Sequence, residues 1–441
     1  MKIAFSFRRL LLVLALLFAL AVLAILAALS SSRVEMTAGG AHKRLLVPLV
    51  VGNVGVNMFT GTGENVSVPG FLAGPVLRPQ ADGSWDATWF CEDRIGHASG
   101  DAPELRIDCG GETHAFTTRN PPIAPDVAPM PGKLVVLSDL EGNRAFLEAA
   151  LRKLGVVGDD GGWSYGPGQL VVLGDAVDRG RDAFAVLWRL HDLATRAQAA
   201  GGGLHLLLGN HEQYLLRGNT SRAHPDYRYA LRQLGGPLAA FGPDTLLGAW
   251  LRAQPVLLQR GSVLFAHGGI SPQVVATGMT VEQIDATMRA YWQRPAGVAT
   301  PHTPALDAVL GRTGLTQYRG YFRAMEKQYP LADQAGIDRM LAHFEARQVV
   351  VAHTLVETVH PLYEGRVFAV DVNHDAARPQ VLVYRGGVPE VVDTGVKRNL
   401  ASGAGKTTRL REFSLFDGDD RRLLAAMYRG VRRISKIPHP Y

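Results

Sequence analysis

Cysteine is nearly absent from this sequence. Only Cys91 and Cys109 occur among its 441 residues, so the chain can form one disulfide at most. An even pair in one short region favours a disulfide if the protein is exported, and two free thiols in a core are the alternative. Internal repeats are also lacking.

Net charge is almost absent from the body of the chain. The formal charge is +6, yet from Lys397 onward eleven lysines and arginines face four acids, so the remainder carries −1. The basicity therefore belongs to a tail over 396–441 and says little about the partners of the body. A basic amphipathic helix over Asp420–Ile434 could lie on an anionic membrane surface or dock on its own domain. We expect no nucleic-acid partner.

Charged and polar side chains are missing from Leu10–Leu29, which argues against a buried helix of a soluble protein. A run of this length spans roughly 30 Å, the thickness of a bilayer core. Lys2, Arg8 and Arg9 precede it, so the amino end should stay in the cytoplasm and the rest should reach the periplasmic or extracytoplasmic side. We predict a single transmembrane anchor within residues 1–30. A cleaved signal peptide is the rival, although its apolar core usually has about 7–15 residues.

A helical period is missing from residues 34–128, which we predict to form a small β domain. Short β-like runs are broken by Gly, Pro and Asn, with turn signals between them. These runs are Leu45–Val51, Trp85–Phe90, Leu105–Asp108 and Thr113–Thr118. A proline-rich stretch over 120–132 then marks a domain boundary.

Residues 133–395 alternate between apolar runs and helical patterns. Strands are expected at Leu134–Leu137, Leu170–Leu173, Leu204–Leu208, Val263–Ala266, Val349–Ala352, Val367–Val370 and Val381–Val383, and helices at Arg144–Leu154, Arg181–Ala199 and within 280–346. Such alternation indicates βαβ units and an α/β fold with parallel strand pairs.

Five of these strands end in a side chain that can bind a metal. The five residues are Asp139, Asp175, Asn210, His267 and His353. Ligands of α/β folds bind at the carboxyl ends of strands. Carboxylate, amide and imidazole groups converging there can hold two divalent cations about 3.5–4 Å apart.

These residues belong to five motifs that follow one another along the chain: Asp139-x-Glu141-Gly142-Asn143, Gly174-Asp175-Ala176-Val177-Asp178-Arg179-Gly180, Gly209-Asn210-His211-Glu212, His267-Gly268-Gly269 and Val351-Ala352-His353-Thr354. As an ordered set they resemble the motifs of the calcineurin-like metallophosphoesterases. The second and fourth are similar to those of the phosphoprotein phosphatase branch, especially its bacterial and Shewanella-like members. The resemblance implies a sandwich of two mixed β-sheets flanked by helices.

It also implies a role for each motif residue. Asp175 would bridge two metals, with Asp139 and Glu141 completing one site and Asn210, His267 and His353 completing the other. A hydroxide between the metals would attack phosphorus. His211, oriented by Asp178, would protonate the leaving oxygen.

Phosphate binding would fall to Arg179, Asn210 and a further arginine. The branch supplies that arginine between the fourth and fifth motifs. We place it at Arg319, with Arg312 as the rival.

Position 141 departs from the family, which usually has His where this chain has Glu141. Three carboxylates at the first metal site should favour Mn²⁺, with Mg²⁺, Fe²⁺ or Zn²⁺ as alternatives. The other interpretation is that Glu141 leaves the first metal labile and the enzyme slow.

The expected activity is metal-dependent hydrolysis of phosphate monoesters, favouring phosphoprotein (Ser, Thr or Tyr) over small phosphoesters. One alternative is hydrolysis of dinucleotide polyphosphates, against which export argues because those nucleotides are cytoplasmic. The other is a non-catalytic domain that binds phosphorylated ligands.

Overall fold

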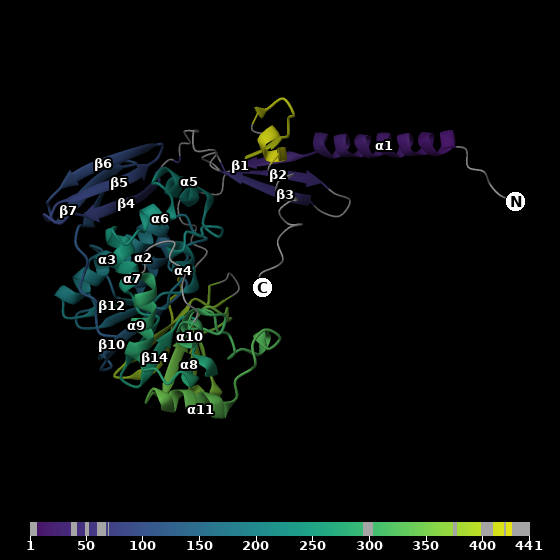
Figure 1. Ribbon diagram of the computed structural model, residues 1–441. Coiled ribbons are helices and arrows are strands. Elements are labelled where there is room, and N and C mark those ends of the chain that lie inside the picture. The colour runs from purple at the N-terminus through teal and green to yellow at the C-terminus, as the bar shows by residue number, and fades with distance from the viewer. Residues whose placement is uncertain are drawn as a thin grey trace. The chain divides into compact units, whose positions relative to one another are not determined.

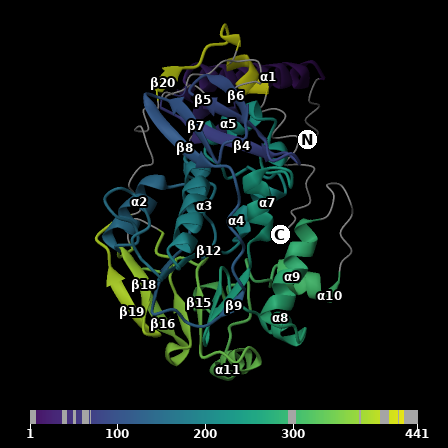
Figure 2. The same cartoon turned by 90° about the vertical axis from the view of Figure 1, so that its left-hand side faces the viewer.

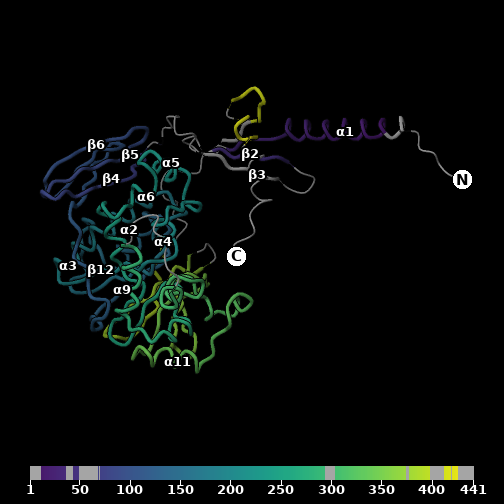
Figure 3. The backbone as a smooth tube through the Cα atoms, in the orientation of Figure 1, coloured from purple at the N-terminus to yellow at the C-terminus, as the bar shows by residue number. Residues whose placement is uncertain are grey.

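The computed structural model describes residues 7–36, 42–48, 53–59, 68, 70–293, 303–373, 377–397, 409–418 and 420–425. The chain divides into two compact units, one of residues 1–69 and 404–441 and the other of residues 70–403 (Figure 1). Figure 3 traces the same path through the Cα atoms.

The smaller unit joins the apolar helix to an antiparallel four-stranded sheet in the order β20-β1-β2-β3. Its elements are α1 (Phe7–Ser30), β1 (Arg33–Met36), β2 (His42–Pro48), β3 (Asn53–Phe59) and β20 (Arg409–Glu412). The segment Leu11–Ser30 is long and apolar enough to cross a membrane. Residues 420–425 of the basic tail are helical, and the rest of the predicted tail helix lies outside the described residues.

Two mixed sheets form the centre of the larger unit. The first has the order β12-β11-β10-β18-β19 and the second the order β16-β17-β15-β14-β13-β9. Their strands are β9 (Val127–Ala128), β10 (Lys133–Leu137), β11 (Gln169–Val172), β12 (Gly203–Leu206), β13 (Leu257–Arg260), β14 (Val263–Ala266), β15 (Gln348–Val351), β16 (His360–Leu362), β17 (Val367–Ala369), β18 (Gln380–Arg385) and β19 (Val388–Asp393). Parallel pairing joins β10 to β11 and β11 to β12 in the first sheet, and β14 to β15 and β15 to β17 in the second.

One buried core lies between these two sheets. It combines Val136 and Val171 of the first sheet with Phe265 and Val350 of the second. The apolar runs of the sequence are therefore strands buried on the inside of a sandwich, and the expected mixed α/β fold is confirmed.

Helices cover the sandwich. α3 packs against β12, and α9 packs against β13. In Figure 2, α2 and α3 lie toward one side of this unit, and α8, α9 and α10 toward the other. The helices are α2 (Arg144–Lys153), α3 (Ala183–Ala199), α4 (Asn210–Leu216), α5 (Pro225–Gln233), α6 (Pro237–Ala240), α7 (Leu246–Ala253), α8 (Pro272–Ala276), α9 (Val281–Trp292), α10 (Pro304–Leu310) and α11 (Gln334–His343), with 3₁₀ turns at Arg323–Met325 and Tyr363–Gly365.

The predicted β domain over 34–128 falls across the two units. Its later part contains β4 (Leu72–Pro79), β5 (Trp85–Cys91), β6 (Arg94–Gly100), β7 (Glu104–Cys109) and β8 (Glu112–Thr117). These strands belong to the larger unit, where β4 packs against α3, α5 and α7. The Trp188 indole nitrogen of α3 donates to the Pro75 carbonyl, and Phe90 meets Tyr229 edge to face. Hydrophobic packing therefore joins this β layer to the helices of the α/β unit.

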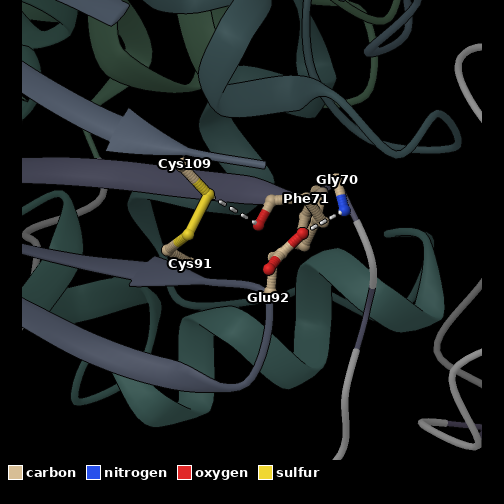
Figure 4. The surroundings of a disulfide bond; sticks show 5 residues. All are labelled: Gly70, Phe71, Cys91, Glu92 and Cys109. Carbon is tan, nitrogen blue, oxygen red and sulfur yellow. Dashed lines mark hydrogen bonds between the residues drawn. A yellow bond between two sulfur atoms is a disulfide. The ribbon is translucent and has the colours of Figure 1, made fainter. Parts of the chain in front are cut away.

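The disulfide predicted between Cys91 and Cys109 is confirmed (Figure 4). It joins the end of β5 to the end of β7 and has a Cα–Cα distance of 5.8 Å. Beside it, the backbone nitrogen of Gly70 donates to Glu92 at 2.8 Å. The bond thus links the two small sheets of the β layer, β4-β5-β6 and β7-β8.

Candidate metal centre

The strand ends of the two sheets meet at one place. Asp175 follows β11, His267 follows β14 and His353 follows β15. Ligand atoms of these three residues lie within 4.8 Å of one another, and all three residues are buried. Asn210 begins α4, shortly after β12 ends at Leu206, and joins them through its side-chain oxygen, 3.0 Å from His267 Nε2. Parallel pairing therefore brings distant motifs together as expected from the sequence.

These four residues present acceptors to one another. His267 Nδ1 lies 2.6 Å from the Leu173 carbonyl oxygen, so that nitrogen donates, and Nε2 is the nitrogen left to bind a cation when the ring gives up its second proton. Nε2 then faces Asp175 Oδ2 at 3.2 Å and His353 Nδ1 at 3.2 Å. A bound cation would stabilise such a cluster of carboxylate, amide and imidazole acceptors.

Three further observations fit a metal ion here. Nε2 of His353 is buried and has no hydrogen-bond partner among the described residues. Burial, followed by the charges of His267 and Arg319, holds the pKa of His353 well below its usual range, so the ring is neutral, as a ligand must be. Burial lowers the pKa of His267, but the charge of Asp175 and the bond between them outweigh burial and raise it to about 10. The pocket thus attracts positive charge.

Asp139 and Glu141 occupy the loop that follows β10. The Asp139 backbone nitrogen donates to Gly174, and that of Glu141 donates to Asp175, at 3.0 and 2.8 Å. Glu141 Oε1 lies 3.0 Å from Arg179 Nε. The structure therefore places Glu141 beside the predicted phosphate ligand Arg179, and metal binding by Glu141 stays a prediction.

The backbone of this site is strained. Asp139, Glu141, Asp175, Asp178, Arg179 and His353 all have positive φ, between 46° and 69°. This region is uncommon for residues other than glycine and is concentrated at functional sites.

At two glycines the loops of the site lie too close together for a residue with a side chain. A side chain at Gly180 would meet the Glu141 carbonyl oxygen at 2.3 Å, and one at Gly174 would meet the Gly209 nitrogen at 2.5 Å. Only glycine fits such approaches, so the glycines of the motifs set the distances between the loops.

His211 and Asp178 form a buried pair. His211 Nδ1 lies 2.8 Å from Asp178 Oδ2, and both side chains are 1% exposed. Burial lowers the pKa of His211, but the hydrogen bond to Asp178 and the charge of Asp175 outweigh it and raise the pKa overall. His211 Nε2 lies 3.7 Å from Asp175 Oδ2, so this nitrogen faces the metal cluster. A protonated imidazole in this position can donate a proton to a bound group.

Glu212 is a residue of the site to which the sequence analysis assigned no role. Its fully buried carboxylate accepts from the backbone nitrogens of Asp175, Ala176 and Gly209 at 2.7 to 2.9 Å, and from Val177 at 3.3 Å. It therefore binds the loop carrying Asp175 to the start of α4. One signal was present: Glu212 occupies the third position of α4, where a glutamate closes a capping box.

Arg319 and Arg312, the two candidates for the further arginine, have different surroundings in the structure. Arg319 Nη2 lies 3.4 Å from His353 Nδ1, at the edge of the cluster. The Arg312 guanidinium stacks over Tyr329 and donates to the Gln328 carbonyl. Arg319 thus lies beside the cluster, whereas Arg312 is occupied elsewhere, and phosphate binding by Arg319 stays a prediction.

Residues 132–357 match the family model described as calcineurin-like phosphoesterase, which covers more than half of the chain. The chain belongs to this family. As a phosphoesterase, the protein is a hydrolase. Calcineurin-like phosphoesterases use a dinuclear centre of divalent metal ions.

Solved structures identify the branch of this phosphoesterase. A cold-active protein-tyrosine phosphatase of a psychrophilic Shewanella is 30% identical, with a TM-score of 0.65, and the match covers 73% of this chain and 99% of that one. Shewanella-like protein phosphatase 2 of Arabidopsis thaliana is 30% identical over 103 residues, 23% of this chain and 25% of that protein.

A second group of relatives consists of dinucleotide tetraphosphatases. The symmetrical bis(5'-nucleosyl)-tetraphosphatase of Janthinobacterium sp. (strain Marseille) is 33% identical over 137 residues, 31% of this chain and 43% of that protein. The chain thus spans less than half of the length of either of these two curated relatives. The phosphoprotein phosphatase-like branch, with Shewanella-like members, is confirmed.

Proposed function

We propose that this phosphoesterase hydrolyses phosphate monoesters on phosphoproteins. The observation that carries the proposal is the match to the Shewanella protein-tyrosine phosphatase, which extends over 99% of that chain. The likeness to the tetraphosphatase covers 43% of that protein. A match that includes the whole relative also includes the loops around the site, where substrate preference resides.

In this proposal the acceptors of the site hold two divalent cations. Asp175, Asn210, His267 and His353 form one set of ligands, and Asp139 and Glu141 complete the other set with Asp175. Bound cations supply Lewis-acid activation of the phosphoryl group and of the water that attacks it. We expect Mn²⁺ or Mg²⁺ at the carboxylate side, because hard oxygen ligands prefer them to zinc.

The remaining side chains handle the phosphate and a proton. Arg179, with a side chain 53% exposed, can swing toward a phosphate at the mouth of the site. Arg319 beside His353 and the amide of Asn210 add donors from the other side. His211, held through Nδ1 by Asp178, donates its Nε2 proton to the departing oxygen. Arginine suits the first role because its planar fork matches phosphate oxygens.

One assay matrix tests the proposal. Purified chain with Mn²⁺, Mg²⁺, Zn²⁺ or no metal would be tested on an aryl phosphate, on phosphotyrosine and phosphoserine peptides, and on diadenosine tetraphosphate. We expect Mn²⁺-dependent release of phosphate from the aryl ester and at least one peptide. Turnover of the dinucleotide alone would replace the phosphoprotein proposal by the second candidate, which its relatives' names support.

We further propose that the site lies outside the cytoplasm, attached to the membrane by α1. The Cys91–Cys109 disulfide supports this location, because such bonds persist in oxidising compartments. A reporter enzyme fused to the carboxyl end should be active on the periplasmic side. Activity confined to the cytoplasm would contradict the proposal.

A further inference from the structure

The end of the apolar helix and the basic tail are built into one hydrophobic core. Val34, Leu45, Phe413 and Leu423 belong to this buried cluster, and Leu29 of α1 packs against it. β20 also pairs directly with β1, with Arg33 opposite Glu412. The polypeptide that follows β20 is therefore held next to the point where α1 ends, within the same unit.

A turn after β20 presents apolar side chains to the outside. Phe416 is 95% exposed and its neighbour Leu415 is 44% exposed. Leaving a side chain of this size in water is unfavourable. In the smaller unit, these two are the exposed large hydrophobic residues described outside the helix itself.

Hydrogen bonds hold this turn in its shape. Arg421 donates through Nη1 to the Leu415 and Phe416 carbonyls at 3.2 and 3.4 Å. The Phe416 nitrogen donates to Ser414 Oγ at 3.3 Å, and the Ser414 nitrogen donates to the buried carboxylate of Asp420 at 2.9 Å. The outward position of Phe416 is thus specified by its neighbours.

The charge beyond this turn has one sign. After Asp420 the sequence contains six lysines and arginines and no acid. Asp417, Asp419 and the buried Asp420 lie between Phe416 and these basic residues, and the segment from Glu412 onward, with six bases and four acids, is still net positive. A net basic segment that carries an exposed aromatic side chain can bind an anionic bilayer surface, with the ring at the headgroup level.

We propose that Phe416 and Leu415 insert into the surface of the anionic bilayer that α1 spans. The smaller unit then has two attachments to the membrane, the amino-terminal helix and the turn at Phe416. This contact combines the two possibilities that the sequence left open for the tail, since Leu423 docks on its own unit while Phe416 points away from it. The proposal rests on membrane insertion of α1 and is independent of phosphatase activity.

Spin labels on the full-length chain in nanodiscs test this contact. The native cysteines are joined in a disulfide, so a Phe416→Cys variant offers one thiol for a nitroxide. Power saturation compares collisions with oxygen, which enriches in lipid, against a nickel chelate, which stays in water. In anionic bilayers we expect the oxygen-to-nickel ratio at position 416 to exceed severalfold that of a Val388→Cys control, an apolar residue 62% exposed in the larger unit. Equal ratios at the two positions would overturn the proposal.

Further controls separate the ways in which the experiment can fail. A label on a Leu20→Cys variant reports α1 itself, so a water-like ratio there refutes the membrane premise, and the proposal with it. A Leu415→Cys label should lose its high ratio when Phe416→Asp is added, because the carboxylate opposes insertion; an unchanged ratio would contradict insertion. Dipolar broadening at position 416 that disappears on dilution with unlabelled chain would show a second copy of the chain as the partner and refute the lipid contact.

Discussion

The two sides of the metal centre differ in how their side chains are held. On the histidine side, His267 lies within 3.2 Å of acceptors on Asp175, Asn210 and His353, and its own side chain is fully buried. On the carboxylate side, the Glu141 side chain is 14% exposed and forms an ion pair with Arg179, whose side chain is half exposed. The side chains of the histidine side are fixed by packing. On the carboxylate side, the ion-pair partner of Glu141, Arg179, can move. We therefore expect tight cation binding on the histidine side and weaker, exchangeable binding on the other.

The largest effect should come from Asp175, the residue that we propose to be common to both sides. Asp175→Asn keeps the size of the side chain and removes its charge. Several kcal/mol of cation stabilisation corresponds to a loss of roughly 10³-fold or more in kcat/KM, at about 1.4 kcal/mol per factor of ten. Metal analysis of the purified variant by mass spectrometry should show reduced occupancy of both positions. Activity equal to the wild type would rule out a two-metal mechanism.

Loss of the proton donor should come next and should leave both metal positions filled. His211→Asn is expected to lower kcat by about 10²–10⁴-fold, which is the usual contribution of general acid catalysis. Aryl esters with good leaving groups need less protonation, so the loss should shrink for them. A uniform loss across leaving groups, with metal content unchanged, would contradict the assignment of His211 as the acid.

Glu212→Gln probes the rigidity of the histidine side. The amide oxygen of glutamine can accept the backbone N–H groups bound to one carboxylate oxygen, but its nitrogen cannot accept those bound to the other. A buried donor left without a partner costs about 1–3 kcal/mol, and displacement of residues behind metal ligands typically costs about 10–100-fold in affinity or activity. Thermal unfolding and Mn²⁺ titration should both shift. A variant with normal Mn²⁺ affinity would show that this clamp serves stability alone.

The second arginine should affect substrate binding. Arg319→Ala is expected to raise KM for an aryl phosphate by about tenfold, because a charged hydrogen bond contributes about 1.5–3 kcal/mol. Arg312→Ala is the matched control, since its guanidinium stacks over Tyr329. Equal effects of the two substitutions would remove Arg319 from the phosphate site.

The smallest change is expected at the exchangeable side. Glu141→Gln should raise the Mn²⁺ concentration needed for half-maximal activity by about tenfold, with the cation of the histidine side retained. Glu141→His should raise activity with zinc, because imidazole suits that ion better than a carboxylate does. Unchanged metal dependence in both variants would show that Glu141 binds no cation and only forms an ion pair with Arg179.

Sequence patterns predicted the sandwich because buried strands require continuous apolar runs, and the runs ending at Asp139, Asp175 and His267 are strands in the structure. They did not predict the division of the β region. Pairing of β1 with β20 joins residues near opposite ends of the chain, and no local pattern records such a distant partner. The role of Glu212 was missed for the same reason, because its carboxylate binds a loop more than thirty residues upstream.

The β1–β20 pairing also makes the larger unit an insertion within the smaller one. Both ends of residues 70–403 lead back to the same four-stranded sheet. A single proteolytic cut in either connection would leave the hydrolase tethered through the other, as long as β20 stays paired. Separation of the larger unit from α1 would then require two cuts.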